Sequence, residues 1–179
     1  MGGIAVVYKS KYGSTKQYAQ WIAQKLDYAS LFEVSQIKPE QLALFDVIVY
    51  GGGLYAGGIN GVSLVTKNPC KNLVVFTVGL ANPDTTDYSE VLSKNFSGEL
   101  LAKTKVFHLR GGISYSGLSL LHKGIMAIFN KAAAKKDRAK MSDEERAIVE
   151  TGGNSVDFTD KSTVAPIVAH VKATLGENS

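Results

Sequence analysis

The chain has 179 residues, of which 45% are hydrophobic and 20% charged, and its formal net charge is +4. This composition predicts one globular domain over residues 1–179 and excludes disordered and collagen-like chains. The single cysteine, Cys70, excludes an internal disulfide and a four-thiolate metal cluster. With three scattered histidines besides, we expect no metal site. No apolar run is long enough to span a bilayer and no signal peptide is visible, so we expect a cytoplasmic protein.

Five short apolar runs have the length and β-branched content of buried strands. They are residues 4–8, 32–37, 46–50, 72–78 and 105–109. The run at 32–37 alternates polar and apolar residues and predicts a strand near the edge of the sheet. The run at 46–50 is followed by Gly51-Gly52-Gly53, which we expect to end the strand abruptly.

Helical patterns separate these runs. Residues 14–26 place Tyr18, Ile22 and Leu26 on one face, and a final helix is predicted from about 163 to 175, with Ser162 as its cap and Pro166 in its first turn. Alternating strands and helices predict a parallel sheet with helices on both faces. Ligands of such sheets bind beyond the carboxyl ends of the strands.

The segment from about 114 to 154 interrupts this alternation and is interpreted as an insertion. Residues 117–134 have the spacing of an amphipathic helix, with Leu118, Leu121, Ile125, Ile128, Phe129 and Ala132 on its apolar face. Ser142 and Glu145 have the spacing of a capping box, which predicts that a further helix starts there. Residues 155–160 are expected to resume the edge of the sheet.

The loop after the first strand has the composition of a phosphate-binding turn. It consists of Ser10, Lys11, Tyr12, Gly13, Ser14 and Thr15. Hydroxyl side chains, backbone N–H groups and the positive end of the following helix all favour an anion at such a place. The loop lacks the three glycines of a dinucleotide fingerprint and the Gly-Lys-Ser/Thr of a Walker loop, so a mononucleotide phosphate is favoured.

This loop resembles the flavodoxin pattern Ser/Thr-x-Thr-Gly-x-Thr, from which it departs only where Tyr12 replaces a threonine. The resemblance extends over the whole chain. It implies an α/β fold of flavodoxin type, a doubly wound five-stranded parallel sheet in the order 2-1-3-4-5, and FMN as the cofactor. The alternatives are that residues 10–15 merely cap a helix, or that the fold is a flavin-free interaction module.

The resemblance also assigns two further loops to the flavin ring. The loop after the third strand would place Gly52, Gly53, Leu54, Tyr55 and Ala56 against the isoalloxazine, with Tyr55 as the stacking residue and Leu54 as the second choice. The loop after the fourth strand would present the backbone of Gly79, Leu80, Ala81 and Asn82 to the pyrimidine edge.

The basic charge of the chain lies in the insertion. Residues 117–140 hold six Lys or Arg (123, 131, 135, 136, 138 and 140) and one acid (137), which gives +5 and leaves −1 for the rest of the chain. Flavodoxins that shuttle electrons are acidic, whereas a basic insertion at this place resembles the menaquinone-dependent protoporphyrinogen dehydrogenases. That resemblance implies an FMN oxidoreductase of heme biosynthesis, passing electrons from a porphyrinogen-type donor to a quinone. The alternative is a non-enzymatic electron carrier with a redox partner protein.

Three fates remain open for the apolar face of residues 117–140. It packs inside its own chain, forms a homodimer, or makes peripheral contact with the inner face of the membrane. Nucleic-acid binding is not expected, because the lysines lie at one helix end without interleaved aromatic residues.

Overall fold

A computed structural model describes residues 3–115, 122–133 and 138–176. Its main sheet runs in the order β2-β1-β3-β5-β6 with all of these strands parallel, and the short β4 pairs antiparallel with the end of β3. The strands are β1 (Ile4–Lys9), β2 (Ala29–Glu33), β3 (Val47–Tyr55), β4 (Gly58–Ile59), β5 (Leu73–Gly79) and β6 (Lys105–Arg110). The predicted doubly wound parallel sheet in the order 2-1-3-4-5 is therefore confirmed.

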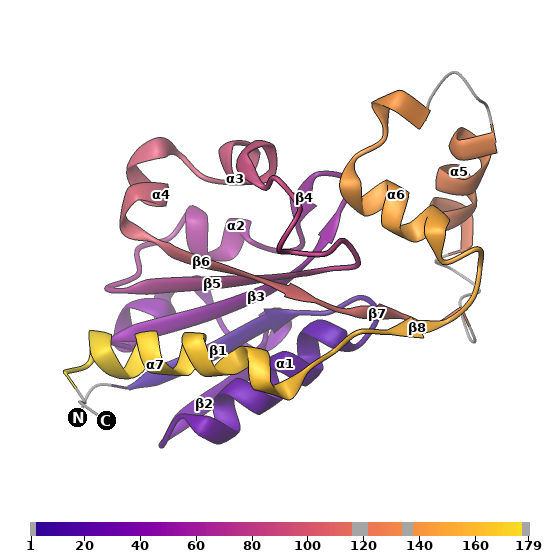
Figure 1. The fold of residues 1–179 in the computed structure, drawn as a ribbon. Helices are drawn as coiled ribbons and strands as arrows, with labels where there is room; N and C mark the ends of the chain where they lie inside the picture. Colours follow the sequence, from indigo (N-terminus) through magenta and orange to yellow (C-terminus); the bar gives the residue numbers. More distant parts are fainter. Residues whose placement is uncertain (1–2, 116–121, 134–137, 177–179) are drawn as a thin grey trace.

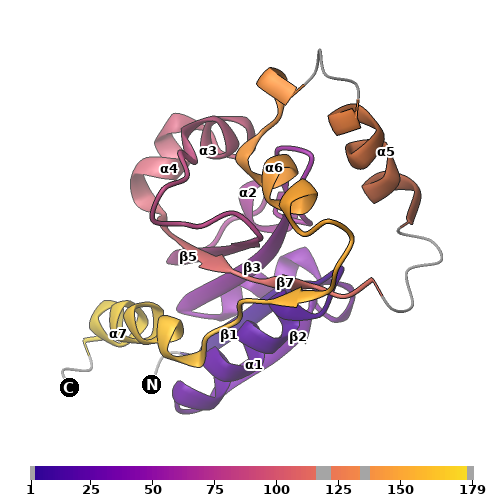
Figure 2. The ribbon, with the colours of Figure 1, turned by 45° about the vertical axis from the view of Figure 1, so that its right-hand side comes forward.

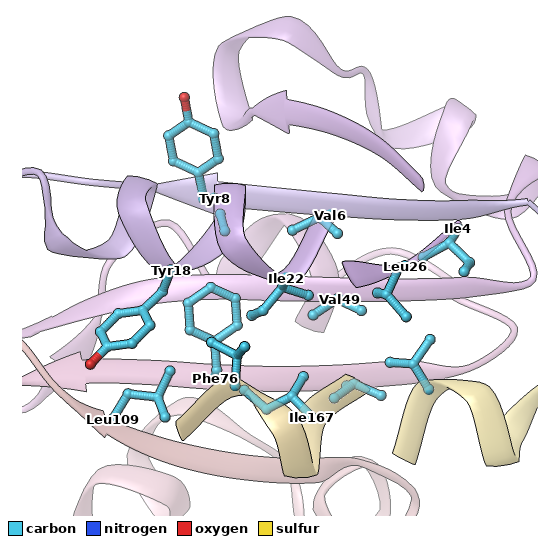
Figure 3. Packing of buried hydrophobic residues seen from close by; sticks show 14 of the residues in the cluster. Ile4, Val6, Tyr8, Tyr18, Ile22, Leu26, Val49, Phe76, Leu109 and Ile167 are labelled. Carbon is cyan, nitrogen blue, oxygen red and sulfur yellow. The ribbon is translucent and has the colours of Figure 1, made fainter. Parts of the chain in front are cut away.

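Helices cover both faces of this sheet (Figure 1). One face carries α1 (Ser14–Lys25) and α7 (Ala165–Thr174), and the other carries η2 (Pro39–Leu44), α2 (Ser63–Thr66), α3 (Ser89–Asn95) and α4 (Gly98–Lys103). Successive strand residues point to opposite faces, so both faces are buried. Val6, Val49 and Phe76 pack beneath α1 and α7 (Figure 3), while Val7 and Val75 pack on the other side.

The insertion stands beyond the carboxyl edge of the sheet (Figures 1 and 2). It contains α5 (His122–Ala133), η3 (Arg138–Lys140) and α6 (Asp143–Glu150). Before and after it, β7 (Gly112–Ile113) and β8 (Val156–Asp157) pair antiparallel in a ladder of their own. The expectation that residues 155–160 resume the edge of the main sheet is therefore wrong.

The described part of the insertion's apolar face packs within the chain. Ile125 is only 2% exposed and clusters with Leu80 and Ile113 of the main body, and Phe129 packs against the same cluster. Leu118 and Leu121, which we also predicted on this face, lie outside the described residues. Ile125 and Phe129 thus pack inside the chain, while contact of this face with a second copy or with a membrane stays a prediction.

The capping box at the start of α6 is confirmed. The Ser142 hydroxyl accepts a hydrogen bond of 3.2 Å from the Glu145 N–H, and the Glu145 carboxylate accepts one of 3.0 Å from the Ser142 N–H. These reciprocal bonds fix the first turn of α6 and the direction of the side chains on it.

The edge strand differs from its prediction at both ends. Residue by residue, β2 pairs with β1 from Ile4 opposite Ala29 to Tyr8 opposite Glu33. The strand stops at Glu33 because the Glu33 N–H donates a hydrogen bond to the Gln36 side chain and residues 34–36 form a 3-10 helix. The pairing with β1 sets the two ends of β2. The alternation of polar and apolar residues at 32–37 carries no information about this pairing.

The third strand does not end at its glycines. β3 continues through Gly51, Gly52 and Gly53, which lie opposite Phe76, Thr77 and Val78 of β5. A Cβ on Gly51 would lie 2.6 Å from the Cε1 and Cε2 atoms of the Phe76 ring. Glycine here makes room for a buried aromatic ring, so the expected abrupt strand end is wrong.

The cap of the final helix also differs from the prediction. The Asp160 carboxylate accepts the Ser162 N–H at 2.8 Å and so caps the 3-10 helix η4 (Lys161–Val164), which leads into α7. Ser162 is therefore not the cap, because Asp160, two residues earlier, already caps η4, whereas Pro166 does lie in the first turn of α7. Within the described residues, none of the helices has both the length and the apolar character needed to cross a bilayer.

Candidate functional site

Loops at the carboxyl edge of the main sheet enclose a cavity of about 50 Å³. The β1–α1 loop, the ends of β3 and β5, the β6–β7 junction and α6 of the insertion form its walls. The lining residues are Lys11, Tyr12, Ser14, Thr15, Gly53, Leu54, Tyr55, Asn60, Val78, Gly79, Leu80, Gly111, Gly112, Ile113, Glu144 and Ile148.

The β1–α1 loop leaves the start of α1 open to an anion. Gly13 turns the chain with a φ of +97°, a conformation that side chains disfavour, and its N–H donates to the Ser10 hydroxyl at 3.1 Å. Within the described residues no side chain caps α1, and its first turn holds no acid. Backbone N–H groups of a first helical turn have no partner inside the helix. The positive end of α1 therefore faces the cavity side of the loop without a competing carboxylate of its own.

The hydroxyl groups of this loop have different surroundings. Thr15 is 3% exposed and lines the cavity, with its Oγ1 atom 3.5 Å from where a Cβ on Gly53 would lie. Ser14 is tied to the β6–β7 junction, since its hydroxyl accepts the Gly112 N–H at 3.0 Å. Ser10 supports the loop itself. Thr15 is thus the hydroxyl best placed to meet a ligand in the cavity.

Tyr55 stands at the mouth of the cavity. It is 39% exposed, and the Lys11 ammonium lies 3.6 Å from its ring centroid. The tyrosine hydroxyl reaches α5, where a Cβ on Gly124 would lie 2.5 Å from it. A cation over an aromatic face at this distance is favourable. Lys11 and Tyr55 therefore form one wall, with a positive charge and a flat apolar surface together.

The end of β5 is held by a carboxylate from the insertion. Glu144 of α6 accepts hydrogen bonds from the N–H groups of Leu80, at 2.8 Å, and Ala81, at 3.0 Å. Burial raises the pKa of Glu144 above its ordinary value, while these two hydrogen bonds and Arg110 oppose the rise. Arg110 in turn donates its Nε hydrogen to the Leu80 carbonyl at 2.9 Å.

A part-buried polar cluster joins β5, β6 and the start of α3. His108 Nδ1 and the hydroxyl of fully buried Thr77 share a hydrogen bond of 2.7 Å, and the Tyr88 ring stacks on His108 with centroids 3.6 Å apart. Burial lowers the pKa of His108 to about 4 and, as the largest cause, raises that of Tyr88 to about 12. Both groups are therefore neutral at pH 7.

A second hollow, of about 360 Å³, adjoins the first. The end of β3 separates the two, and Leu54, Tyr55 and Glu144 line both. The far wall of the second hollow comes from the start of α3, and the near wall from the start of α6, including Arg146. Any molecule bound in it would lie directly beside Tyr55.

The cavity brings together most of the residues predicted from the sequence, but not all. Ser10 and Gly13 belong to the loop but do not line the cavity, and Gly52 is buried inside the sheet. Ala56 faces the second hollow, and Asn82 closes an exposed turn. Ala81 contributes its N–H group, which Glu144 already holds. The predicted ring-binding segments thus reach the cavity through Gly53, Leu54, Tyr55, Gly79 and Leu80.

Sequence reasoning missed the insertion's share of the site. Glu144 and Ile148 come from α6, and neither they nor Asn60 were among the predicted site residues. The capping box did predict where α6 begins, so Glu144 could be placed in its first turn. Nothing in the sequence, however, indicates that this turn docks 64 residues away on Leu80.

The profile of the flavodoxin domain family matches residues 5–140 of the chain. The chain belongs to this family. Among curated proteins none matches it. The matched range of the flavodoxin domain contains the main sheet except Ile4, together with α5, and it ends before α6.

Several solved structures are distantly similar to this flavodoxin domain. A flavodoxin from Fusobacterium nucleatum bound to flavin mononucleotide is 16% identical, with 65% of this chain and 74% of that chain covered and a TM-score of 0.45. A flavoprotein from Lactobacillus acidophilus NCFM in complex with FMN is 14% identical, covering 62% and 93%, with a TM-score of 0.41. The rubredoxin oxygen:oxidoreductase of Desulfovibrio gigas is 12% identical, covering 98% and 37%, with a TM-score of 0.49. The family assignment rests on the domain match and not on these likenesses.

Proposed function

We propose that this flavodoxin domain binds FMN at the carboxyl edge of its sheet and works as an electron-transfer protein. The observation that carries the proposal is the uncapped start of α1, which opens beside the same cavity as the ends of β3 and β5. A phosphate is stabilised at such a helix end by free N–H groups and by the helix dipole, and Lys11 adds a full positive charge. Membership of the flavodoxin domain family supports the same ligand.

The residues at hand suit FMN in three respects. The Thr15 hydroxyl and the first turn of α1 would hold its phosphate. The N–H groups of Leu80 and Ala81 are a pair of donors suited to carbonyl oxygens of the ring, and Tyr55 and Leu54 offer apolar surface to its faces. Glycine at position 53 keeps the space beside Thr15 free of side-chain atoms.

FMN, when bound, supplies reversible one-electron and two-electron redox chemistry. The residues of this chain would bind the FMN, orient its ring and exclude water from it. Leu54 and Tyr55 make one wall apolar, and the backbone donors at Leu80 and Ala81 fix the direction of a ring edge. Because Lys11 lies at this wall, negative charge arriving on a bound ligand is favoured there.

Thr15 gives the sharpest test of this proposal. Thr15→Val removes the hydroxyl at nearly constant volume, and Thr15→Ser retains it. A hydrogen bond to a charged group contributes about 1.5–3 kcal/mol, so Thr15→Val should weaken FMN binding by roughly ten- to a hundredfold in titration calorimetry, with a much smaller loss for Thr15→Ser. Thr174→Ala, in α7, is the control and should bind FMN like the wild type.

The purified protein provides a second measurement. Denaturing it after incubation with a flavin mixture should release FMN and not FAD. Release of no flavin, together with equal behaviour of Thr15→Val and Thr15→Ser, would overturn the proposal in favour of a flavin-free interaction module.

A narrower form of the proposal makes the domain an oxidoreductase that takes electrons from a porphyrinogen-type donor and passes them to a quinone. What supports it is the second hollow, whose volume of about 360 Å³ suits a small-molecule substrate and which adjoins Tyr55. The net +5 of residues 117–140 also suits an acidic partner or an anionic membrane surface.

Turnover separates the narrower form from a simple electron carrier. The FMN-loaded protein is mixed anaerobically with protoporphyrinogen and a menaquinone analogue, and porphyrin fluorescence is followed. Catalytic formation of porphyrin supports the oxidoreductase. Flavin reduction by a reductase without any porphyrin formation supports the carrier.

A further inference from the structure

The insertion places a carboxylate on the backbone donors that the proposed ligand would need. Glu144 accepts from Leu80 N–H at 2.8 Å and from Ala81 N–H at 3.0 Å, at the end of β5 and inside the wall of the cavity. A carboxylate with one oxygen on each of two adjacent N–H groups has the acceptor geometry of a ring edge that carries two acceptor atoms.

The fit of Glu144 is close enough to exclude another occupant. A Cβ on Gly79 would lie 2.6 Å from the Glu144 Cδ atom, so the carboxylate occupies the space that a side chain at position 79 would take. Ile148, one turn further along α6, lines the same cavity. The space that remains is about 50 Å³, whereas pockets for drug-sized ligands and cofactors measure roughly 300–1,000 Å³.

Holding Glu144 there has a cost. Burial raises its pKa, and the neighbouring carboxylate of Asp143 acts in the same direction. The groups that oppose this are the two N–H donors and Arg110. A desolvated carboxylate beside another acid gains free energy by returning to water, once another acceptor takes the hydrogen bonds of the Leu80 and Ala81 N–H groups.

α6 is attached in a way that permits its withdrawal. Its C-terminal end is followed by Gly152 and Gly153, both with positive φ, of +59° and +82°. Its N-terminal turn is held within the insertion, by the Ser142 box and by the Lys131–Glu145 ion pair of 3.3 Å. Withdrawal of α6 would separate Ala147 and Ile148 from the Leu80 cluster but would keep the contacts within the insertion, and the two glycines are the positions where the backbone would change direction.

We propose that Glu144 is a built-in competitor for the ring of the flavin, so that FMN binds the Leu80 and Ala81 donors only when α6 withdraws. The inference rests on the proposed function and adds the identity of the residue that controls access to that site. It places the control of ring binding in α6, the part of the insertion that lies outside the range matching the flavodoxin domain family.

The experiment compares Glu144→Ala and Glu144→Gln with Asp143→Ala. The last variant removes the same charge one residue away but leaves the donor pair occupied, because Asp143 pairs with Arg146 on the surface. FMN, riboflavin and inorganic phosphate are titrated into each protein by calorimetry.

We expect Glu144→Ala to bind FMN and riboflavin about tenfold or more tightly than the wild type, by the same factor for both, because the competition concerns the ring and not the phosphate. Phosphate affinity should not change, and Asp143→Ala should stay near the wild type. Glu144→Gln should lie between them, because an amide oxygen is a weaker competitor.

Hydrogen exchange gives a readout that does not depend on affinity. The Leu80 and Ala81 amides should be protected in the flavin-free wild type, exposed in flavin-free Glu144→Ala, and protected again when FMN is added. Equal or weaker flavin binding by Glu144→Ala, or a gain for FMN but not for riboflavin, would overturn the inference while leaving FMN binding intact. Absence of flavin binding in every variant would overturn the proposed function itself.

Discussion

Gly51 and Phe76 should be energetically coupled. Gly51 lies in β3 with an ordinary extended backbone, so alanine there would otherwise be tolerated. Its Cβ, however, would lie 2.6 Å from two ring carbons of Phe76, against the 3.5–4.0 Å that carbon atoms prefer. The Phe76 Cζ atom would lie closer still. The ring is fully buried among Tyr18, Ile22 and Ile167 and would have to move by about 1.5 Å or more in a close-packed core (Figure 3).

Overpacking of this kind costs about 1–3 kcal/mol, and we expect Gly51→Ala to lie near the upper end because the ring has no free side to move toward. Phe76→Leu alone should cost of order 1–2 kcal/mol. In the double variant the overlap is relieved, so the two costs should not add, and the coupling should reach about 2 kcal/mol.

Urea unfolding with a constant m-value measures these differences. Gly98→Ala serves as the control, because a Cβ there meets nothing within 4 Å, and it should be neutral or slightly stabilising. If Gly51→Ala is as stable as the wild type, or if its cost simply adds to that of Phe76→Leu, the glycine does not serve the ring and the reasoning is refuted.

Two other predictions concern the cavity and the cluster of Thr77, Tyr88 and His108. Replacing Tyr55 by alanine should shift the absorption of bound FMN and relieve quenching of its fluorescence, with an affinity loss of only about 0.5–1.5 kcal/mol, and an unchanged spectrum would transfer the stacking role to Leu54. His108 should titrate near pH 4 in an NMR experiment on the folded protein. Since its pKa is lowered on folding, its contribution to stability is full above about pH 6.5 and is lost as the pH falls toward 4, a dependence that His108→Gln should remove.

Local signals in the sequence predicted the main sheet because each strand is a compact apolar run between turn residues. The start of α6 was predictable for a similar reason, since Ser142 and Glu145 interact within one turn. The same kind of reasoning gave a wrong strand end at Gly51–Gly53. A run of glycines has the same sequence pattern in a flexible loop as in a strand where it makes space for an aromatic ring of the neighbouring strand.

The position of Glu144 shows where sequence reasoning ends. Its contact with Leu80 depends on how a whole inserted segment folds back over the sheet, which no local pattern encodes. The limits of β2 were missed for a related reason, since they follow from the register with β1.

The ladder between β7 and β8 has a consequence for how such a protein can evolve. The chain leaves the main body at Ile113 and returns directly opposite at Val156, so everything between them is a side branch. The entropy of closing such a branch rises only slowly with its length. Segments of other lengths or compositions could be exchanged at this junction without disturbing the strand order, and the part that covers the site could diversify while the sheet beneath it stays the same.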